Sequence, residues 1–170
     1  MTGPDASSWI QRFAGLVPPG GRVLDVACGG GRHARFFLQR GHPVTLVDRD
    51  TSGVKDLEED PAAEILECDL EAGAPWPFPG REFEGVVVTN YLWRPGLPDI
   101  VAAVAPGGAL LYETFARGQE QFGRPCNPDF LLEPGELLDA VRGRLRVAAY
   151  EDLIIEEPGP SAVQRIAAIR

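Results

Sequence analysis

VLDVACGGGRHA, residues 23–34, is the most informative segment of this sequence. An apolar, β-branched run passes directly into three glycines and then into a helical pattern, which predicts a strand, a tight turn and a helix. Glycine suits such a turn because it adopts positive φ, and because the missing side chain lets a ligand approach the backbone. For the glycines alone, a bare tight turn between strand and helix remains the alternative interpretation.

On both sides of this segment, short strand-like runs alternate with helical patterns. Such alternation predicts parallel strands with crossover helices, and two adjacent strands at the end of the chain predict an antiparallel hairpin at the sheet edge. We therefore predict an α/β fold: a Rossmann-like, seven-stranded, mostly parallel sheet with helices on both faces and a C-terminal antiparallel hairpin. The predicted strands cover residues 23–27, 43–48, 63–69, 83–90, 108–115, 145–157 and 161–170, and the predicted helices cover 31–41, 51–59, 97–105 and 134–143.

Length and composition indicate one globular domain over residues 1–170, with a leading helix and linker at 1–20 and the sheet and helices at 21–170. The chain has 170 residues, 44% of them hydrophobic, and 25 acidic side chains against 16 Lys and Arg, a net charge of −9. This acidic balance argues against a free nucleic acid partner. Oligomeric state is left open.

Apolar runs and cysteines bear on localisation. No apolar run approaches the roughly 20 residues that a membrane-spanning helix needs, and the N-terminal sequence lacks the order of a signal peptide. The three cysteines are widely spaced, without a CxxC pair, so we expect no disulfide framework and no metal site. These features predict a cytoplasmic protein without membrane association.

Acidic residues lie at or near the ends of the first three predicted strands. In a parallel sheet, ligands bind beyond the carboxyl ends of the strands, so Asp25, the glycine loop, Asp48 and Asp69 are expected around one crevice. Asp48, at the end of the second strand, is the candidate acceptor for the two hydroxyls of a ribose. A helix-capping role is the alternative for Asp48.

Two nucleotide-type cofactors fit this arrangement. Residues 29–34 match GxGxxA and Asp48 follows Gly31 by 17 residues, which leaves a nicotinamide cofactor open. Asp25 favours a different ligand, because an additional carboxylate would repel a pyrophosphate but attract an ammonium or sulfonium group. The acids therefore favour a cationic ligand.

VLDVACGGGRHA resembles the first motif of the class I S-adenosylmethionine-dependent methyltransferases, and the resemblance covers nearly the whole chain. Within that family the chain looks most like small bacterial members related to tellurite-resistance and thiopurine methyltransferases. The resemblance implies S-adenosylmethionine as the cofactor. One departure is Ala27, which stands where the family usually has its first glycine.

The resemblance also implies roles for individual residues. Asp25 and the loop would contact the methionine part of the cofactor, Asp48 the ribose, Asp69 with Leu70 the adenine, and Asn90 would lie beside the methyl donor. Arg12, on the leading helix, either reaches the cofactor carboxylate or lies on the surface. The full predicted cofactor-binding set is Arg12, Asp25, Ala27, Cys28, Gly29, Gly31, Asp48, Arg49, Asp69, Leu70 and Asn90.

The acceptor site is expected after the fourth and fifth strands. Asn90 and Tyr91 are the candidate catalytic residues, as positioning groups rather than bases, although Tyr91 could equally be a packing residue. The loop 117–133 is long enough to shape a site. Its charged and aromatic residues, Arg117 among them, either recognise an anionic or aromatic acceptor or pin the loop through ion pairs. Arg94, after the fourth strand, is a further candidate, Glu113 either pairs with an arginine or faces the crevice, and His33 is expected to be a solvated helix residue.

The leading functional hypothesis is methyl transfer from S-adenosylmethionine to a small-molecule acceptor, with an anionic acceptor among the options. Methyl transfer from a sulfonium needs alignment and exclusion of water more than a strong base. Two alternatives stay open: a nicotinamide-dependent oxidoreductase, and a non-catalytic cofactor-binding module of the same fold.

Overall fold

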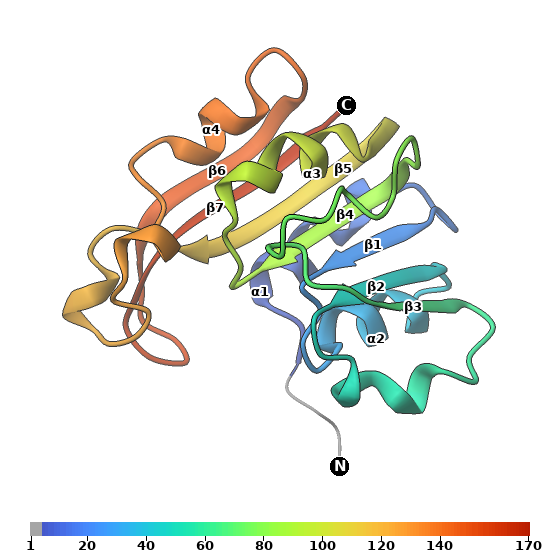
Figure 1. The fold of residues 1–170 in the computed structure, drawn as a ribbon. Helices are drawn as coiled ribbons and strands as arrows, with labels where there is room; N and C mark the ends of the chain where they lie inside the picture. Colours follow the sequence, from blue (N-terminus) through green and yellow to red (C-terminus); the bar gives the residue numbers. More distant parts are fainter. Residues whose placement is uncertain (1–4) are drawn as a thin grey trace.

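The computed structural model describes residues 5–170, and a seven-stranded sheet lies at its centre (Figure 1). The strand order is β3-β2-β1-β4-β5-β7-β6. Strands β1 to β5 run parallel to one another, whereas β7 is antiparallel to both β5 and β6. This arrangement confirms the predicted mostly parallel sheet with its C-terminal hairpin. The strands are β1 (Val23–Val26), β2 (Val44–Asp48), β3 (Ala63–Glu67), β4 (Phe83–Thr89), β5 (Val104–Phe115), β6 (Arg146–Ile155) and β7 (Ser161–Ile169).

Helices cover both faces of the sheet (Figure 1). Helices α1 (Ser8–Phe13) and α2 (Arg32–Gln39) pack on one face, and α3 (Leu97–Ala102) and α4 (Glu136–Val141) on the other. Successive strand residues point to opposite faces, so Val23 and Leu24 belong to different core clusters. Because both faces are covered, the central strands are rich in buried valine and leucine, with Asp25 as a charged exception in β1.

Five short 3₁₀ helices complete the secondary structure assigned in residues 5–170. They lie in connections between the longer elements or extend a helix end. They are η1 (Ala14–Leu16), η2 (Ser52–Leu57), η3 (Arg94–Gly96), η4 (Gln119–Gln121) and η5 (Pro128–Phe130).

Two predicted helices differ from the structure. The segment 51–59 forms only η2, and the helix predicted over 97–105 ends at Ala102, with β5 already begun at Val104. Pro106-Gly107-Gly108 then lies inside β5 as an irregularity: Phe83 pairs with Val104, but Gly85 pairs with Ala109. Gly108 permits this packing, because a Cβ there would lie 2.8 Å from the carbonyl oxygen of Glu84.

The strand order reverses between β1 and β4, which is where open α/β sheets bind ligands. Val26, near the end of β1, is level with Val47 of β2 and Val88 of β4. The carboxyl ends of these strands therefore meet at one edge of the sheet. No helix within residues 5–170 is both long enough and apolar enough to cross a bilayer.

Candidate functional site

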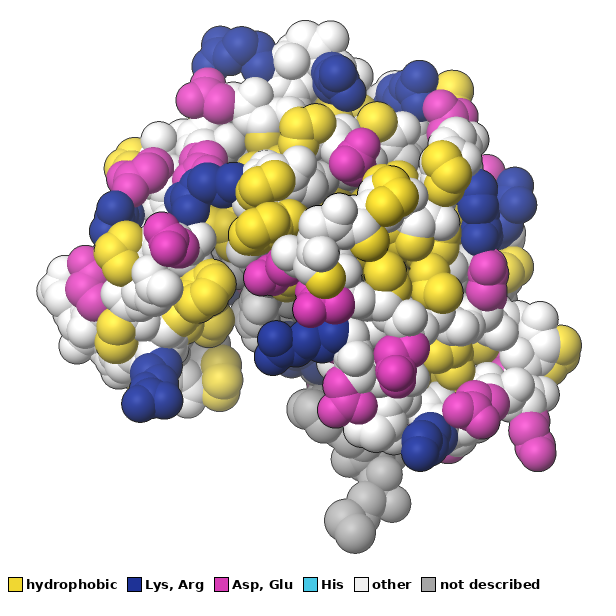
Figure 2. All heavy atoms as spheres, viewed as in Figure 1, with side chains coloured by type: hydrophobic (Ala, Val, Ile, Leu, Met, Phe, Trp, Pro, Cys, Tyr) yellow, Lys and Arg dark blue, Asp and Glu magenta, His cyan; other side chains and the backbone are white. Residues whose placement is uncertain are grey.

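A cavity of about 510 Å³ lies beyond the carboxyl ends of β1 to β5, within the size range of small-molecule sites. On this face the molecule is hollowed between the projecting segment of residues 117–133 and the rest of the structure (Figure 2). Every parallel strand contributes residues to the cavity, and the loop 117–133 adds two. The lining consists of Ala27, Asp48, Arg49, Cys68, Asp69, Leu70, Glu71, Asn90, Tyr91, Leu92, Thr114, Phe115, Pro125 and Phe130.

The glycine loop joins β1 to α2 and packs against η2. Gly31, at the N-cap of α2, has φ 75°, and a Cβ there would lie 2.5 Å from a methyl group of Val54. Arg35 donates a hydrogen bond to the carbonyl of Gly30 and forms an ion pair with Asp56 at 2.6 Å. These contacts fix the loop against η2, and nothing lies within 4 Å of a Cβ built at Gly29 or Gly30.

The prediction that the Asp25 side chain faces the crevice is wrong. Asp25 is 1% exposed, and its carboxylate accepts the backbone N–H of Ala34, in the first turn of α2, at 3.0 Å. Asp25 lies within β1 rather than at its end, so its side chain is buried between strand and helix. Burial, opposed by that hydrogen bond, raises the pKa of Asp25 to about 7.

Asp48, by contrast, lies at the edge of the cavity as expected. One carboxylate oxygen accepts the N–H of Gly29 at 2.8 Å, and the other accepts the N–H of Asp50 at 3.0 Å. These two bonds orient the side chain, and each oxygen keeps a further lone pair for a ligand hydroxyl. Asp69, whose carboxylate accepts the N–H of Glu71 at 2.9 Å, lines the same cavity.

The cavity lining is rich in negative charge. It contains the carboxylates of Asp48, Asp69 and Glu71, and Arg49 is its only cationic residue. Glu71 was missing from the predicted site, although it follows Asp69 and Leu70 directly in sequence. Such a lining favours a ligand with positive charge over an anion.

Asn90 and Tyr91 follow the end of β4 and line the cavity. Asn90 has φ 54°, a left-handed conformation that asparagine tolerates better than most residues. The Tyr91 hydroxyl is buried and has no hydrogen-bond partner among residues 5–170. Burial, together with the nearby Glu71 and Asp69 charges, raises the pKa of Tyr91 well above its usual range, so this phenol stays protonated at neutral pH.

Four other predicted cofactor residues are not part of the lining. Arg12 is exposed and lies 3.6 Å from Glu151 of β6, which agrees with the surface alternative for this residue. Burial raises the pKa of Cys28 to about 12, and its thiol packs in the core. Gly29 and Gly31 shape the loop instead, with Gly29 orienting Asp48.

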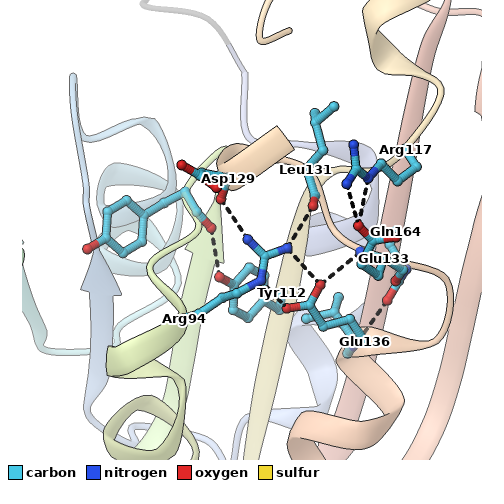
Figure 3. Close-up of polar contacts among 10 residues, drawn as sticks. Arg94, Tyr112, Arg117, Asp129, Leu131, Glu133, Glu136 and Gln164 are labelled. Atoms are coloured by element: carbon cyan, nitrogen blue, oxygen red, sulfur yellow. Dashed lines mark hydrogen bonds and ion pairs between the residues drawn. The ribbon is translucent and has the colours of Figure 1, made fainter. Parts of the chain in front are cut away.

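The two arginines considered for the acceptor site form ion pairs with glutamates outside it. Arg94 pairs with Glu136 through contacts of 2.7 and 3.0 Å and donates to the carbonyl oxygens of Asp129 and Leu131 at 2.8 Å each (Figure 3). Arg117 pairs with Glu133 at 2.6 Å. These arginines therefore hold the loop 117–133 in place.

A further ion pair joins β5 to β7. Glu113 lies 2.5 Å from Arg165, and both side chains are nearly buried. The prediction that Glu113 pairs with an arginine, and not the alternative that it faces the crevice, is therefore confirmed.

His33 is not the solvated residue that we expected. It is 2% exposed, its Nε2 accepts the N–H of Ser7 at 3.2 Å, and its Nδ1 lies 3.3 Å from the Thr89 hydroxyl. Burial lowers its pKa to about 4, so the ring is neutral and joins α2 to the N-terminal segment and to β4. The sequence did contain a signal for this burial, because His33 lies beside Ala34 and one turn before Phe37, on the buried face of α2.

The structure also reveals lining residues that the sequence did not indicate. They are Cys68 after β3, Leu92 after β4, Thr114 in β5, and Pro125 and Phe130 from the loop 117–133. The length of the loop predicted that it shapes a site, but not which of its side chains do so. No group of three or more His, Cys, Asp or Glu side chains within residues 5–170 is arranged to hold a metal ion.

Comparisons with known proteins agree with this architecture. Residues 23–108 match a family described as "Methyltransferase domain". The chain is 34% identical over 108 residues to ribosomal protein L11 methyltransferase from Bordetella parapertussis, covering 61% of this chain but only 33% of that protein.

Two solved structures share the fold at lower sequence identity. TehB from Haemophilus influenzae has a TM-score of 0.76 at 18% identity, over 97% of this chain and 62% of that one. The 1,6-didemethyltoxoflavin-N1-methyltransferase of Burkholderia thailandensis, solved with 1,6-didemethyltoxoflavin and S-adenosylhomocysteine bound, has a TM-score of 0.67 at 17% identity, over 95% and 77%.

Proposed function

This chain belongs to the class I S-adenosylmethionine-dependent methyltransferases, and on that basis we propose that it transfers a methyl group from S-adenosylmethionine to a small-molecule acceptor. The observation that carries the proposal is the cavity at the strand ends, where Asp48, Asp69 and Asn90 come together. A cytoplasmic location is part of the proposal and is supported by three free cysteines.

The residues of the cavity fit this cofactor. Asp48 offers free lone pairs to the ribose hydroxyls, and the open space over Gly29 and Gly30 lets a ligand approach the backbone. The net negative charge of the lining also favours a cationic sulfonium cofactor over one that carries a pyrophosphate. Asp25, which the sequence suggested for that purpose, instead supports the loop through Ala34.

Methyl transfer requires little acid–base chemistry from the protein. The bound cofactor supplies a methyl group on a sulfonium, which departs as a neutral thioether when the acceptor forms its bond to the methyl carbon. Asn90 and Tyr91 would position the acceptor in line with that bond, and the loop 117–133 would exclude water. An acceptor O–H or N–H proton must also leave, and Tyr91, which stays protonated, is not the group that accepts it.

The two alternative functions have less support. The matching family and the relatives named above are methyltransferases, and the acidic lining of the cavity disfavours the pyrophosphate of a nicotinamide cofactor. A non-catalytic module would keep the same cavity. Transfer of the labelled methyl group from S-adenosylmethionine to any acceptor separates it from an enzyme.

Calorimetric titration with S-adenosylhomocysteine and with NAD tests the proposal. We expect S-adenosylhomocysteine to bind and NAD not to bind. Asp48→Ala should weaken binding at least about tenfold, or ~1.4 kcal/mol, because the ribose hydroxyls lose their acceptor. The matched control is Asp50→Ala, whose exposed carboxylate caps Ser52 outside the cavity and should leave the affinity unchanged. Folded protein that binds NAD but not S-adenosylhomocysteine would refute the proposal.

A further inference from the structure

The strand order gives the cavity two ends. Asp48 and Asp69 follow β2 and β3, whereas Thr114 and Phe115 belong to the end of β5, on the other side of β1 and β4. If the proposed function holds, the adenosyl group occupies the first end and the reacting methyl group lies near Asn90. The β5 end then remains for the acceptor, so its chemistry indicates what the acceptor is.

The β5 end is aromatic and apolar. Its side chains are Leu92, Phe115, Pro125 and Phe130, with Thr114 as the polar member. Phe130 is 46% exposed and lines the cavity, whereas Phe122 of the same loop is exposed outside it, so the Phe130 ring is the one available to a ligand there.

The backbone around Phe130 is rigidly held. Arg94 donates hydrogen bonds to the carbonyl oxygens of Asp129 and Leu131, the residues on either side of it, and is itself anchored by Glu136 (Figure 3). These hydrogen bonds keep Phe130 at the cavity and prevent its side chain from packing into the core. Preorganisation of this kind reduces the entropy cost of binding a ligand.

No arginine at this end is available for an anion. Arg94, Arg117 and Arg165 are paired with Glu136, Glu133 and Glu113 respectively. Arg124 is exposed and outside the lining, and Arg49 lies at the β2 end beside the carboxylates. An anionic acceptor would therefore meet repulsion without a partner, and a protonated amine, though attracted, has no lone pair for the methyl group.

We propose that the acceptor is a small, uncharged aromatic molecule that binds against Phe115 and Phe130. This proposal rests on the proposed function, and of the anionic and aromatic acceptors that the loop sequence left open it selects an uncharged aromatic one. Aromatic side chains favour such a ligand through apolar burial and ring packing.

Three probes of similar size, which differ in charge, test this proposal. They are methyl 4-hydroxybenzoate, 4-hydroxybenzoate and tyramine, titrated at neutral pH into protein saturated with S-adenosylhomocysteine. We expect the neutral ester to bind at least about tenfold more tightly than the anion or the cation. Phe130→Ala should weaken ester binding about tenfold and leave the affinity for S-adenosylhomocysteine unchanged. Phe122→Ala is the control, since Phe122 is an exposed phenylalanine of the same loop outside the lining.

Each contrary outcome has a defined meaning. Tighter binding of 4-hydroxybenzoate, especially if Arg124→Ala abolishes it, would overturn the proposal in favour of an anionic acceptor. Tighter binding of tyramine, or no binding of any probe to protein that still binds S-adenosylhomocysteine, would overturn it as well. Failure to bind S-adenosylhomocysteine would instead count against the proposed function.

Discussion

Two residues at the cavity, Ala27 and Asn90, hold backbone conformations that L-amino acids rarely adopt. Their φ angles are 53° and 54°, and they follow the neighbouring central strands β1 and β4. Asparagine is one of the residues that tolerate this region, whereas alanine has no such compensation. The departure from the family's usual glycine at position 27 therefore has a physical cost.

Ala27→Gly should stabilise the protein. The left-handed conformation costs alanine about 1–2 kcal/mol, and the additional unfolded-state entropy of glycine offsets part of the gain, which leaves about 0.5–1 kcal/mol. Urea unfolding measures the difference. Ala140→Gly, within helix α4, is the control and should lose about 1 kcal/mol. If Ala27→Gly were less stable than the wild type, position 27 would carry no strain.

Asp25 makes stability depend on pH. Its pKa is raised to about 7 from the ordinary value of 3.8, mainly by burial, so between these pH values the folded state binds a proton that the unfolded state releases. Its contribution to stability is full below about pH 4 and is lost as pH rises through about 7. The amide introduced by Asp25→Asn cannot ionise, and its oxygen can still accept the N–H of Ala34.

The stability of Asp25→Asn relative to wild type should therefore rise with pH, by about 1.4 kcal/mol per pH unit between about pH 4 and 7. Urea unfolding at about pH 4, 6 and 8 measures this slope. Asp25→Ala should be ~1–3 kcal/mol less stable than Asp25→Asn at each pH, because it leaves the Ala34 N–H without an acceptor. A slope of zero or of opposite sign would show that Asp25 is ionised in the folded state at all these pH values.

At the scale of elements, local patterns predicted what local sequence determines. The β1–glycine–α2 segment and the final hairpin combine a hydrophobic period with turn residues, and both formed as predicted. The extent of β5 was not predictable. Pro106-Gly107-Gly108 is typical of a helix end followed by a loop, and only its packing against Glu84 shows that it lies within a strand.

The site shows the same division between local and long-range information. Asp48 and Asp69 follow strands and could be placed from the sequence, since parallel strands end at one edge. Phe130 and Pro125 could not, because their position depends on contacts across 35 residues or more between Arg94 and the loop. Asp25 was misplaced because strand periodicity does not show whether an acid near a strand end faces a crevice or the helix above it.

The loop 117–133 should depend on Arg94 for its order. Arg94→Lys keeps the charge but loses the paired contacts to Glu136 and the bonds to two carbonyl groups. We expect amide hydrogen exchange over residues 119–132 to accelerate at least about tenfold, with a loss of ~1–2 kcal/mol in unfolding free energy. Arg142→Lys is the control, because its pair with Asp139 is largely exposed. Unchanged exchange in Arg94→Lys would show that other contacts hold the loop.

For the whole molecule, the sheet order β3-β2-β1-β4-β5-β7-β6 determines which chemistry meets at the cavity. Carboxylates follow the strands on one side of the β1–β4 reversal, and aromatic side chains follow β5 and its loop on the other. The helices pack on the two faces and leave this edge of the sheet to the loops. The proposed cofactor is therefore expected to lie across the strand ends with its adenine at the β3 end and its sulfur atom toward Asn90.

A crystal structure with S-adenosylhomocysteine bound tests that claim most directly. The account predicts the ribose hydroxyls within hydrogen-bond distance of the Asp48 carboxylate, the adenine beside Asp69 and Leu70, and the sulfur atom toward Asn90. A ligand bound outside this cavity, or one reversed so that its adenine packs against Phe115, would contradict it.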